Sequence, residues 1–293
     1  RRATIEAYSN CDSVLLYNDL TNEKATFLGR KKNNGTGTHF MWENRDIRYN
    51  VLRAVGYYKG KPVAEDLILL NGLEQAPNFE LLYQDDKKIL KGEAGYNYLY
   101  RLNCGGDDYT DSFGQLWLQD NTNYSRSWAE NFKDLNPYLA SQRTTNDPIH
   151  GTRDWTLFQH FRFGRHQLEY RFPVADGTYR IELYFTEPWH GTGGSASADC
   201  EGLRIFDVAV NDSVVLDDLD IWAESGHDGV CKKVVYAIVK GGMLKIHFPE
   251  VKAGQALISG IAIASTDQEL KPTVFPASVA ALRLNDDLYL ITI

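Results

Sequence analysis

Polar and apolar residues alternate with a period of two along most of the chain. Such alternation, rich in β-branched and aromatic side chains, is typical of strands that bury one face. The segments that carry it are ATIEAYS, SVLLYN, THFMWEN, NVLRAVGYY, QLEYRF, RIELYF, RIFDVAV, VVYAIV, LKIHF and LISGIAIAS. Turn-forming clusters such as NNGTG, YKGKP, ADGTY and VKGGM separate them. The pattern predicts an all-β protein built from sandwiches, with one short helix at SWAENF, residues 127–132.

The alternation breaks near LNGLEQAPNFE, where a strand ends in Asn-Gly and a polar, proline-containing stretch follows. A second apolar pattern resumes at YNYLYRLNCGG and continues to IAIAS. We therefore predict a small sandwich domain over residues 1–75, a linker over 76–95 and a larger sandwich over 96–266. The tail, residues 267–293, ends in a strand-like segment and is predicted to pack on one of the sandwiches.

The charged residues and the lengths of the apolar runs limit the kinds of partner that the protein can have. Lys and Arg total 31 against 39 Asp and Glu, a formal charge of −8, and the basic residues form no stripe longer than GRKK. This pattern excludes a phosphate-tracking surface, so no nucleic-acid partner is expected. No apolar run approaches the roughly 18 residues that span a bilayer, so no membrane insertion is expected. The first residues have neither an initiator Met nor an apolar signal core, and we expect the chain to be a piece of a longer protein.

The four cysteines, Cys11, Cys104, Cys200 and Cys231, lie far apart and form no CxxC pair. That spacing argues against a zinc or thiol redox site. Isolated buried thiols are favoured, with a Cys200–Cys231 bridge as the alternative. The seven histidines are equally scattered, so neither a metal nor a cofactor is predicted.

Acidic residues gather in two loops. NCGGDDYTDSFG holds Asp107, Asp108 and Asp111 but lacks the ligand rhythm of an EF-hand, so a solvated turn bonded to nearby N–H groups is favoured over a calcium site. DDLDIW, residues 217–222, and Glu187 offer further carboxylates, the groups that hydrolyse glycosides in pairs. Acidic residues in strand-end turns are usually solvated, and the chain has no GxSxG elbow, triad context or P-loop lysine. We predict no catalytic residue.

The segment FTEPWHGTGGS, residues 185–195, places Trp189 on a loop directly after a strand. The flat apolar face of an indole stacks on the C–H face of a pyranose, so an exposed Trp189 would make a sugar platform. The alternative is an indole that folds back over the end of the sandwich and covers core. The residues themselves leave both interpretations open.

The first part of the chain resembles the immunoglobulin-like domain that follows the catalytic barrel in glycoside hydrolase family 2, the β-galactosidase and β-glucuronidase relatives. The segments that carry the likeness are IEAYSNCDSVLLYND, FLGRKK, HFMWEN and LRAVGYYKGKPVAED. The resemblance implies an immunoglobulin-like sandwich, and the catalytic barrel lies outside this sequence.

The second part resembles malectin, a carbohydrate-binding β-sandwich of jelly-roll type. The matching segments are YRLNCGGDDYTDSFGQLW, LFQHFRFG, YRIELYFTEPW, IFDVAVNDSVVLDDLDIW, GHDG and LKIHF, in the family's order. By this resemblance, the ligand-contacting aromatic pair of malectin falls on Trp189 and His190, and a second aromatic falls on Phe163. A third contact falls in a region of different length, where Tyr138 or Trp155 is the substitute.

At one position the sequence differs from the pattern of malectin. Malectin's ligand-binding aspartate falls on Gly254, so the acidic contact is missing unless Glu250 replaces it. The glucose-disaccharide preference of the family is therefore not carried over to this chain.

These resemblances imply the non-catalytic C-terminal portion of a family 2 glycosidase that binds an oligo- or polysaccharide through its malectin-like domain. Its other partner would be the catalytic domain of the parent enzyme. The alternative is a structural or oligomerisation module that no longer binds sugar. A secreted or bacterial periplasmic location follows from the resemblance alone.

Overall fold

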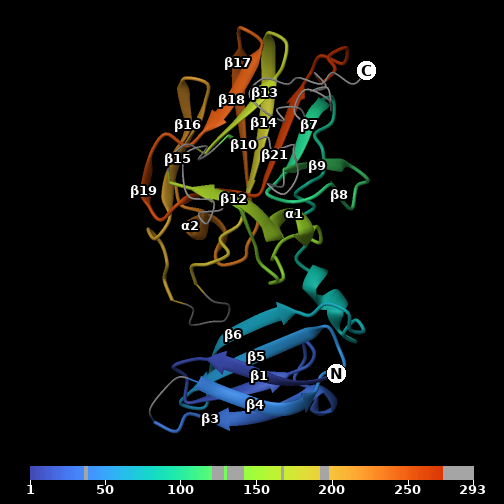
Figure 1. Ribbon diagram of the computed structural model, residues 1–293, viewed down its shortest axis with the longest axis vertical. Coiled ribbons are helices and arrows are strands. Elements are labelled where there is room, and N and C mark those ends of the chain that lie inside the picture. Colours follow the sequence, from blue (N-terminus) through green and yellow to red (C-terminus); the bar gives the residue numbers. More distant parts are fainter. Residues whose placement is uncertain (36–38, 121–128, 131–141, 166–167, 192–197, 273–293) are drawn as a thin grey trace, which may run out of the picture.

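The computed structural model describes residues 1–35, 39–120, 129–130, 142–165, 168–191 and 198–272. In Figure 1, two strand-rich bodies lie end to end, the first (blue) below the second. The described helices are short, and the all-β class predicted from the alternation is confirmed.

The first body consists of two sheets. One pairs β1 with β4 and the other has the order β3-β2-β5-β6. The strands are β1 (Arg2–Tyr8), β2 (Ser13–Tyr17), β3 (Phe27–Lys32), β4 (His39–Asp46), β5 (Val51–Tyr58) and β6 (Lys61–Leu69), with a 3-10 turn η1 (Lys24–Thr26). Val14 and Leu16 from β2 meet Phe40 and Trp42 from β4 in one buried cluster, so the two sheets close on each other as a small sandwich.

In its described residues, the second body has three sheets. The first, with the order β17-β14-β21-β7-β9-β8, contains β7 (Asn97–Cys104), β8 (Tyr109–Thr110), β9 (Leu116–Asp120), β14 (Gly177–Phe185), β17 (Cys231–Val239) and β21 (Gly260–Ser265). The second, with the order β10-β13-β18-β15-β16, contains β10 (Ala129–Glu130), β13 (Glu169–Pro173), β15 (Ile205–Val210), β16 (Ser213–Leu219) and β18 (Met243–His247), with β19 (Val251–Ala253) paired to β15. The third, β11-β12-β20, contains β11 (Gln142–Thr144), β12 (His160–Gly164) and β20 (Ala256–Ile258). Two helices, α1 (Trp155–Gln159) and α2 (Ile221–Ser225), lie in the connections.

Strand β14 is buried on both faces. Its residues Ile181 and Leu183 belong to the large core between the sheets, whereas Tyr184 belongs to a second cluster on the opposite face. Because successive side chains of a strand point to opposite faces, both clusters need apolar residues from the same strand. The segment RIELYF therefore places apolar residues on both faces, and its two charged residues, Arg180 and Glu182, pair with each other.

The segment predicted as a linker packs against the second body. Ala76, Phe79 and Leu90 are buried, and Phe79 opens the 3-10 helix η2 (Phe79–Tyr83). The ring of Phe79 lies 5.7 Å from that of Trp155, and this cluster also contains Val51 from the first body. The two bodies are thus joined by a shared apolar cluster, although the boundaries at residues 75 and 96 stay predictions.

Some expectations are corrected. The helix expected at residues 127–132 is wrong where the structure describes it, because Ala129–Glu130 forms strand β10 on the edge of β13. All four cysteines are buried and free, so the prediction of isolated thiols is confirmed and the Cys200–Cys231 bridge does not form. Of the tail, residues 267–293, the described part lies on the second body, where Leu270 packs against the main core and its backbone oxygen accepts from Asn97 Nδ2 at 2.8 Å. The packing of residues 273–293, outside the described part of the chain, stays a prediction.

We predict that Phe79→Ala lowers the free energy of unfolding by about 3 kcal/mol, because it opens a cavity where the two bodies meet. The exposed Leu81 on the same helix is the matched control, and Leu81→Ala should stay within about 0.5 kcal/mol of the parent protein. Denaturant unfolding of both variants measures the difference. If both variants lose the same small amount of unfolding free energy, Phe79 does not pack tightly where the two bodies meet.

Candidate functional site

The loop that follows β14 carries a half-exposed tryptophan. Trp189 is 44% exposed, and its indole meets the rings of Phe161 and Phe163 at 5.3 Å, with interplanar angles of 80° and 82°. Phe161 is fully buried in the main core and Phe163 is half-buried. Each interpretation left open by the sequence therefore holds in part: the indole is anchored on core aromatics and also offers surface to solvent.

A buried ion pair lies beneath this loop. Glu187 and Arg204 are 0% and 1% exposed, and the Arg204 guanidinium donates to both carboxylate oxygens of Glu187. Glu187 Oε1 also accepts from the backbone N–H groups of Trp189, at 3.0 Å, and His190, at 3.1 Å. The Arg204 guanidinium lies 5.1 Å from the Trp189 ring centroid. Since its oxygens are occupied in this way, Glu187 orients the loop and is not placed as a catalytic acid.

His227 ties the loop from the other side. Its Nε2 lies 3.1 Å from Asp228 Oδ2 and its Nδ1 lies 3.2 Å from the backbone oxygen of His190. Both ring nitrogens face acceptors, and only the doubly protonated ring donates at both. Burial opposes the charge, but the bonds and attraction to Asp228, with the field of Asp147, outweigh it and raise the pKa of His227.

Strands β11 and β12 complete one side of the site. Phe163 on β12 packs against Trp189, and the Arg143 guanidinium from β11 lies 5.8 Å from the Phe163 ring centroid. We call Arg143, Phe163, Trp189, His190 and Arg204 the rim site. It joins three of the residues predicted from the resemblance: Phe163, Trp189 and His190.

The other predicted residues do not join the rim site among the described residues. Trp155 is only 7% exposed, packs against Phe79 and Tyr83, and donates its Nε1–H to the backbone oxygen of Thr152. Its ring therefore holds the junction between the two bodies. Tyr138 lies outside the described residues.

Gly254 occupies the position that the resemblance assigns to malectin's acidic contact. Gly254 has φ +62°, and a Cβ there would lie 2.8 Å from the backbone oxygen of Leu203, so no aspartate fits this backbone. Glu250 is exposed just before β19, and its backbone oxygen accepts from Asp207 N at 2.9 Å. Within the described residues, no contact joins Glu250 to the rim site.

The carboxylates of the acidic loops find their partners within the protein. Asp111 accepts from the backbone N–H groups of Phe113 and Gln115, as predicted, but it is buried at 5% exposure and not solvated. Carboxylate oxygens of Asp207, Asp217 and Asp218 lie within 4.8 Å of one another. Lys252 pairs with Asp218, and Asp207 accepts from the backbone of Asp218, so this cluster carries no metal proposal.

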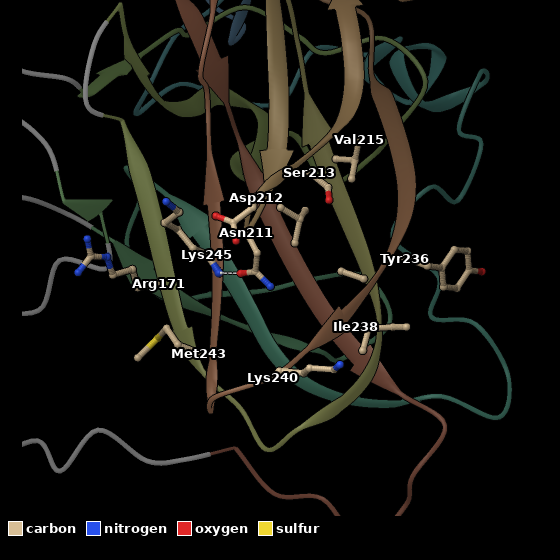
Figure 2. Close-up of a pocket in the computed structure, with 12 residues that line it drawn as sticks. Arg171, Asn211, Asp212, Ser213, Val215, Tyr236, Ile238, Lys240, Met243 and Lys245 are labelled. Carbon is tan, nitrogen blue, oxygen red and sulfur yellow. Dashed lines mark hydrogen bonds between the residues drawn. The ribbon is translucent and has the colours of Figure 1, made fainter.

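A groove of about 800 Å³ opens elsewhere on the second body (Figure 2). Its lining includes Lys240, Met243, Lys245, Asn211, Ile238 and Tyr236. It lies toward the Val239 end of β17, whereas the rim loop follows Phe185, which pairs with Cys231 at the other end of that strand. Figure 2 shows the Tyr236 ring pointing away from the groove. No aromatic ring in view faces into the groove, whereas the half-exposed ring of Trp189 stands at the rim.

The comparisons with known proteins bear on this geometry. The family described as "Malectin domain" matches residues 98–269, more than half of the chain. The chain belongs to the malectin domain family. Malectin of Danio rerio is 25% identical over 166 residues, which cover 55% of this chain and 52% of that protein. Malectin of Mus musculus is 26% identical over 149 residues, or 50% and 45% of the two chains. The chain spans about half the length of these curated relatives, and the resemblance to malectin is confirmed.

Residues 1–64 match a second family, described as "Domain of unknown function (DUF4982)". Among solved structures, a β-glucuronidase of Bacteroides uniformis is similar at 24% identity and a TM-score of 0.45, over 90% of this chain and 27% of that one. The ANX2 ectodomain of Arabidopsis thaliana is similar at 14% identity and a TM-score of 0.46, over 92% and 82% of the two chains. None of the described helices has the length and apolar character needed to cross a membrane.

Sequence reasoning missed two partners of the malectin domain's loop. Arg204 stands 17 positions from Glu187, and His227 was noted only as part of the motif GHDG. Neither spacing signals a contact, because Arg204 precedes a strand of another sheet and His227 reaches the loop only through the pairing of β17 with β14. The one available signal was a charged residue at the start of the apolar strand RIFDVAV, where burial requires a partner.

We predict that Glu187→Gln lowers the free energy of unfolding by about 3–5 kcal/mol, because Arg204 is then left buried without its counter-charge. Glu169→Gln is the matched control: Glu169 pairs with the half-exposed Arg171, and such pairs contribute about 1 kcal/mol or less. Denaturant unfolding separates the two. A loss at Glu187 no larger than at Glu169 would show that the pair does not anchor the loop.

The raised pKa of His227 predicts a pH dependence. The carboxylates that face the ring are Asp228, Asp147 and, from β6, Asp66. A raised pKa means that the stabilisation is complete below the ordinary value of about 6.5 and is lost as the pH rises through the higher folded value. We expect about 1 kcal/mol of this loss in the parent protein between about pH 6 and pH 9.

The measurement is thermal unfolding against pH, with His227→Gln compared with the parent protein. The variant should lack the His227 component, so the two curves should converge at alkaline pH. His160→Gln, a histidine of β12 outside the loop, should follow the parent curve. If the stability of the parent protein and that of His227→Gln change with pH in parallel, a charged His227 is not the cause of the pH dependence.

Proposed function

We propose that this chain is the non-catalytic C-terminal part of a bacterial glycoside hydrolase of family 2, and that its malectin domain binds saccharide at the rim site. The observation that carries the proposal is the half-exposed Trp189, held at a fixed angle by Phe161 and Phe163. A rigid aromatic ring at a rim offers stacking area to a pyranose at little entropic cost.

The resemblance of the first part to the domain that follows the barrel in family 2 supports a parent glycosidase of the β-galactosidase or β-glucuronidase type. The parent's catalytic domain would then be the protein partner of this chain. A secreted or periplasmic location would suit a saccharide-binding part, since its ligands lie outside the cytoplasm.

A structural role is the second candidate, and the shared apolar cluster favours it. Val51 of the first body, Phe79 and Trp155 of the second are buried together. A malectin domain fixed in this way would serve as a buttress or oligomer contact even without a ligand.

We predict that Trp189→Ala weakens saccharide binding by at least about tenfold while costing about 1 kcal/mol of stability, since nearly half of the side chain is already exposed. Tyr8→Ala removes an even more exposed aromatic from the first body and should change neither quantity. A glycan array with the whole chain finds the ligand, and calorimetric titration measures the variants.

Two results would contradict the proposal. No binding to any array saccharide would leave the structural role, whereas full binding by Trp189→Ala would move the site away from the rim. Loss of several kcal/mol of stability in that variant would show that the indole is mainly core.

A further inference from the structure

The rim site is edged by two arginines that make no ion pair among the described residues. Arg143 and Arg165 are both exposed. Arg143 donates only a long bond, 3.4 Å, to the backbone of Gln142, and Arg165 donates to the backbone oxygen of Gly254 at 3.3 Å. These bonds leave most of each guanidinium's donors to solvent.

The sheet register turns Arg143 toward Phe163. Arg143 on β11 pairs directly with Phe161 on β12, so the two side chains share one face, and Phe163 lies two residues further along that face. Arg165 comes immediately after β12 ends, and its bond to the backbone oxygen of Gly254 places its guanidinium beside the turn before β20. The short distance between the Arg143 guanidinium and the Phe163 ring agrees with this placement.

The acidic groups of the site do not balance these charges. Glu187 is already paired with Arg204 in the buried layer below, and the backbone at Gly254 has no room for an aspartate. The exposed part of the rim therefore has two cations without a carboxylate partner among the described residues, in a protein whose formal charge is −8. A surplus against the overall charge of a protein marks a local preference for anions.

We infer that the rim site takes an anionic saccharide whose uronate carboxylates pair with Arg143 and Arg165 while a sugar ring stacks on Trp189. The inference rests on the proposed function and names its ligand class. A guanidinium fork matches a carboxylate with two parallel hydrogen bonds, and it also stacks on an aromatic ring, as Arg143 does on Phe163. A neutral sugar would stack on the aromatic surface but would leave the guanidinium groups of both arginines hydrogen-bonded to water.

The test compares one ligand in two forms. Oligouronates of several linkages are titrated calorimetrically against the whole chain, together with the carboxyl-reduced, neutral oligosaccharides made from them. We expect the acidic form to bind at least about tenfold more tightly, since charge-assisted bonds are the stronger ones. That preference should shrink as sodium chloride rises from about 50 to about 500 mM, because both arginines are exposed and screened.

Three variants locate the effect. Arg143→Gln with Arg165→Gln should remove the preference for the acidic form and keep binding of the neutral one. Arg171→Gln, an exposed arginine that lines the distant groove, should keep both. Trp189→Ala should weaken both forms together.

The outcomes separate the inference from the function on which it rests. Equal or tighter binding of the neutral form would overturn the uronate class and leave saccharide binding intact. A preference that survives the double arginine variant would also overturn it. No binding of either form, at any linkage, would overturn saccharide binding itself.

Discussion

The buried pair of Glu187 and Arg204 is the interaction on which the rim depends. Removing two charges from water costs several kcal/mol per ion, and their attraction offsets this only when the remaining donors and acceptors are also satisfied. Here Arg204 reaches the backbone oxygen of Gln255, while Glu187 accepts from the N–H groups of Trp189 and His190. The pair thus connects the end of β14, the start of β15 and the turn before β20. Any shift of one of these segments would leave a buried charge unmatched, which is why an exposed loop can hold an aromatic ring at a defined angle.

The same strand that ends in this loop also connects the two halves of the molecule. β14 presents Ile181 and Leu183 to the main core and Tyr184 to the cluster that contains Trp155 and Phe79. Because a strand is a stiff element with side chains on alternate faces, its position is set by both clusters at once. The rim loop therefore continues from a strand that is fixed on both sides, and the junction with the first body rests on the same strand. Binding and structural roles share one support, so a structural function for the junction does not argue against a ligand at the rim.

Period-two alternation predicted the strands well because it follows directly from the burial of one face, as in ATIEAYS and LKIHF. It failed at residues 129–130, where composition favoured a helix and the edge of β13 imposed a strand. Trp155 shows a different limit. An indole can either stack on a sugar at the surface or be buried against a linker. For Trp155 the choice depends on Phe79, a partner some seventy residues away in the chain. Trp189 was identified because its loop directly follows a strand, whereas Arg204 and His227 reach the loop only through tertiary contacts that leave no spacing in the sequence.

The difference from malectin at Gly254 lies in the backbone as well as in the side chain. At φ +62° an L-residue is strained, and its Cβ would lie only 2.8 Å from the backbone oxygen of Leu203. An aspartate could be accommodated only if the segment before β20 moved, and that segment supplies the backbone oxygen of Gln255 to Arg204 and that of Gly254 to Arg165. The loss of an acidic contact, the burial of Arg204 and the position of Arg165 are therefore coupled through one turn. An acidic side chain cannot be introduced at Gly254 by one substitution, because the same turn that excludes the carboxylate holds the guanidinium groups.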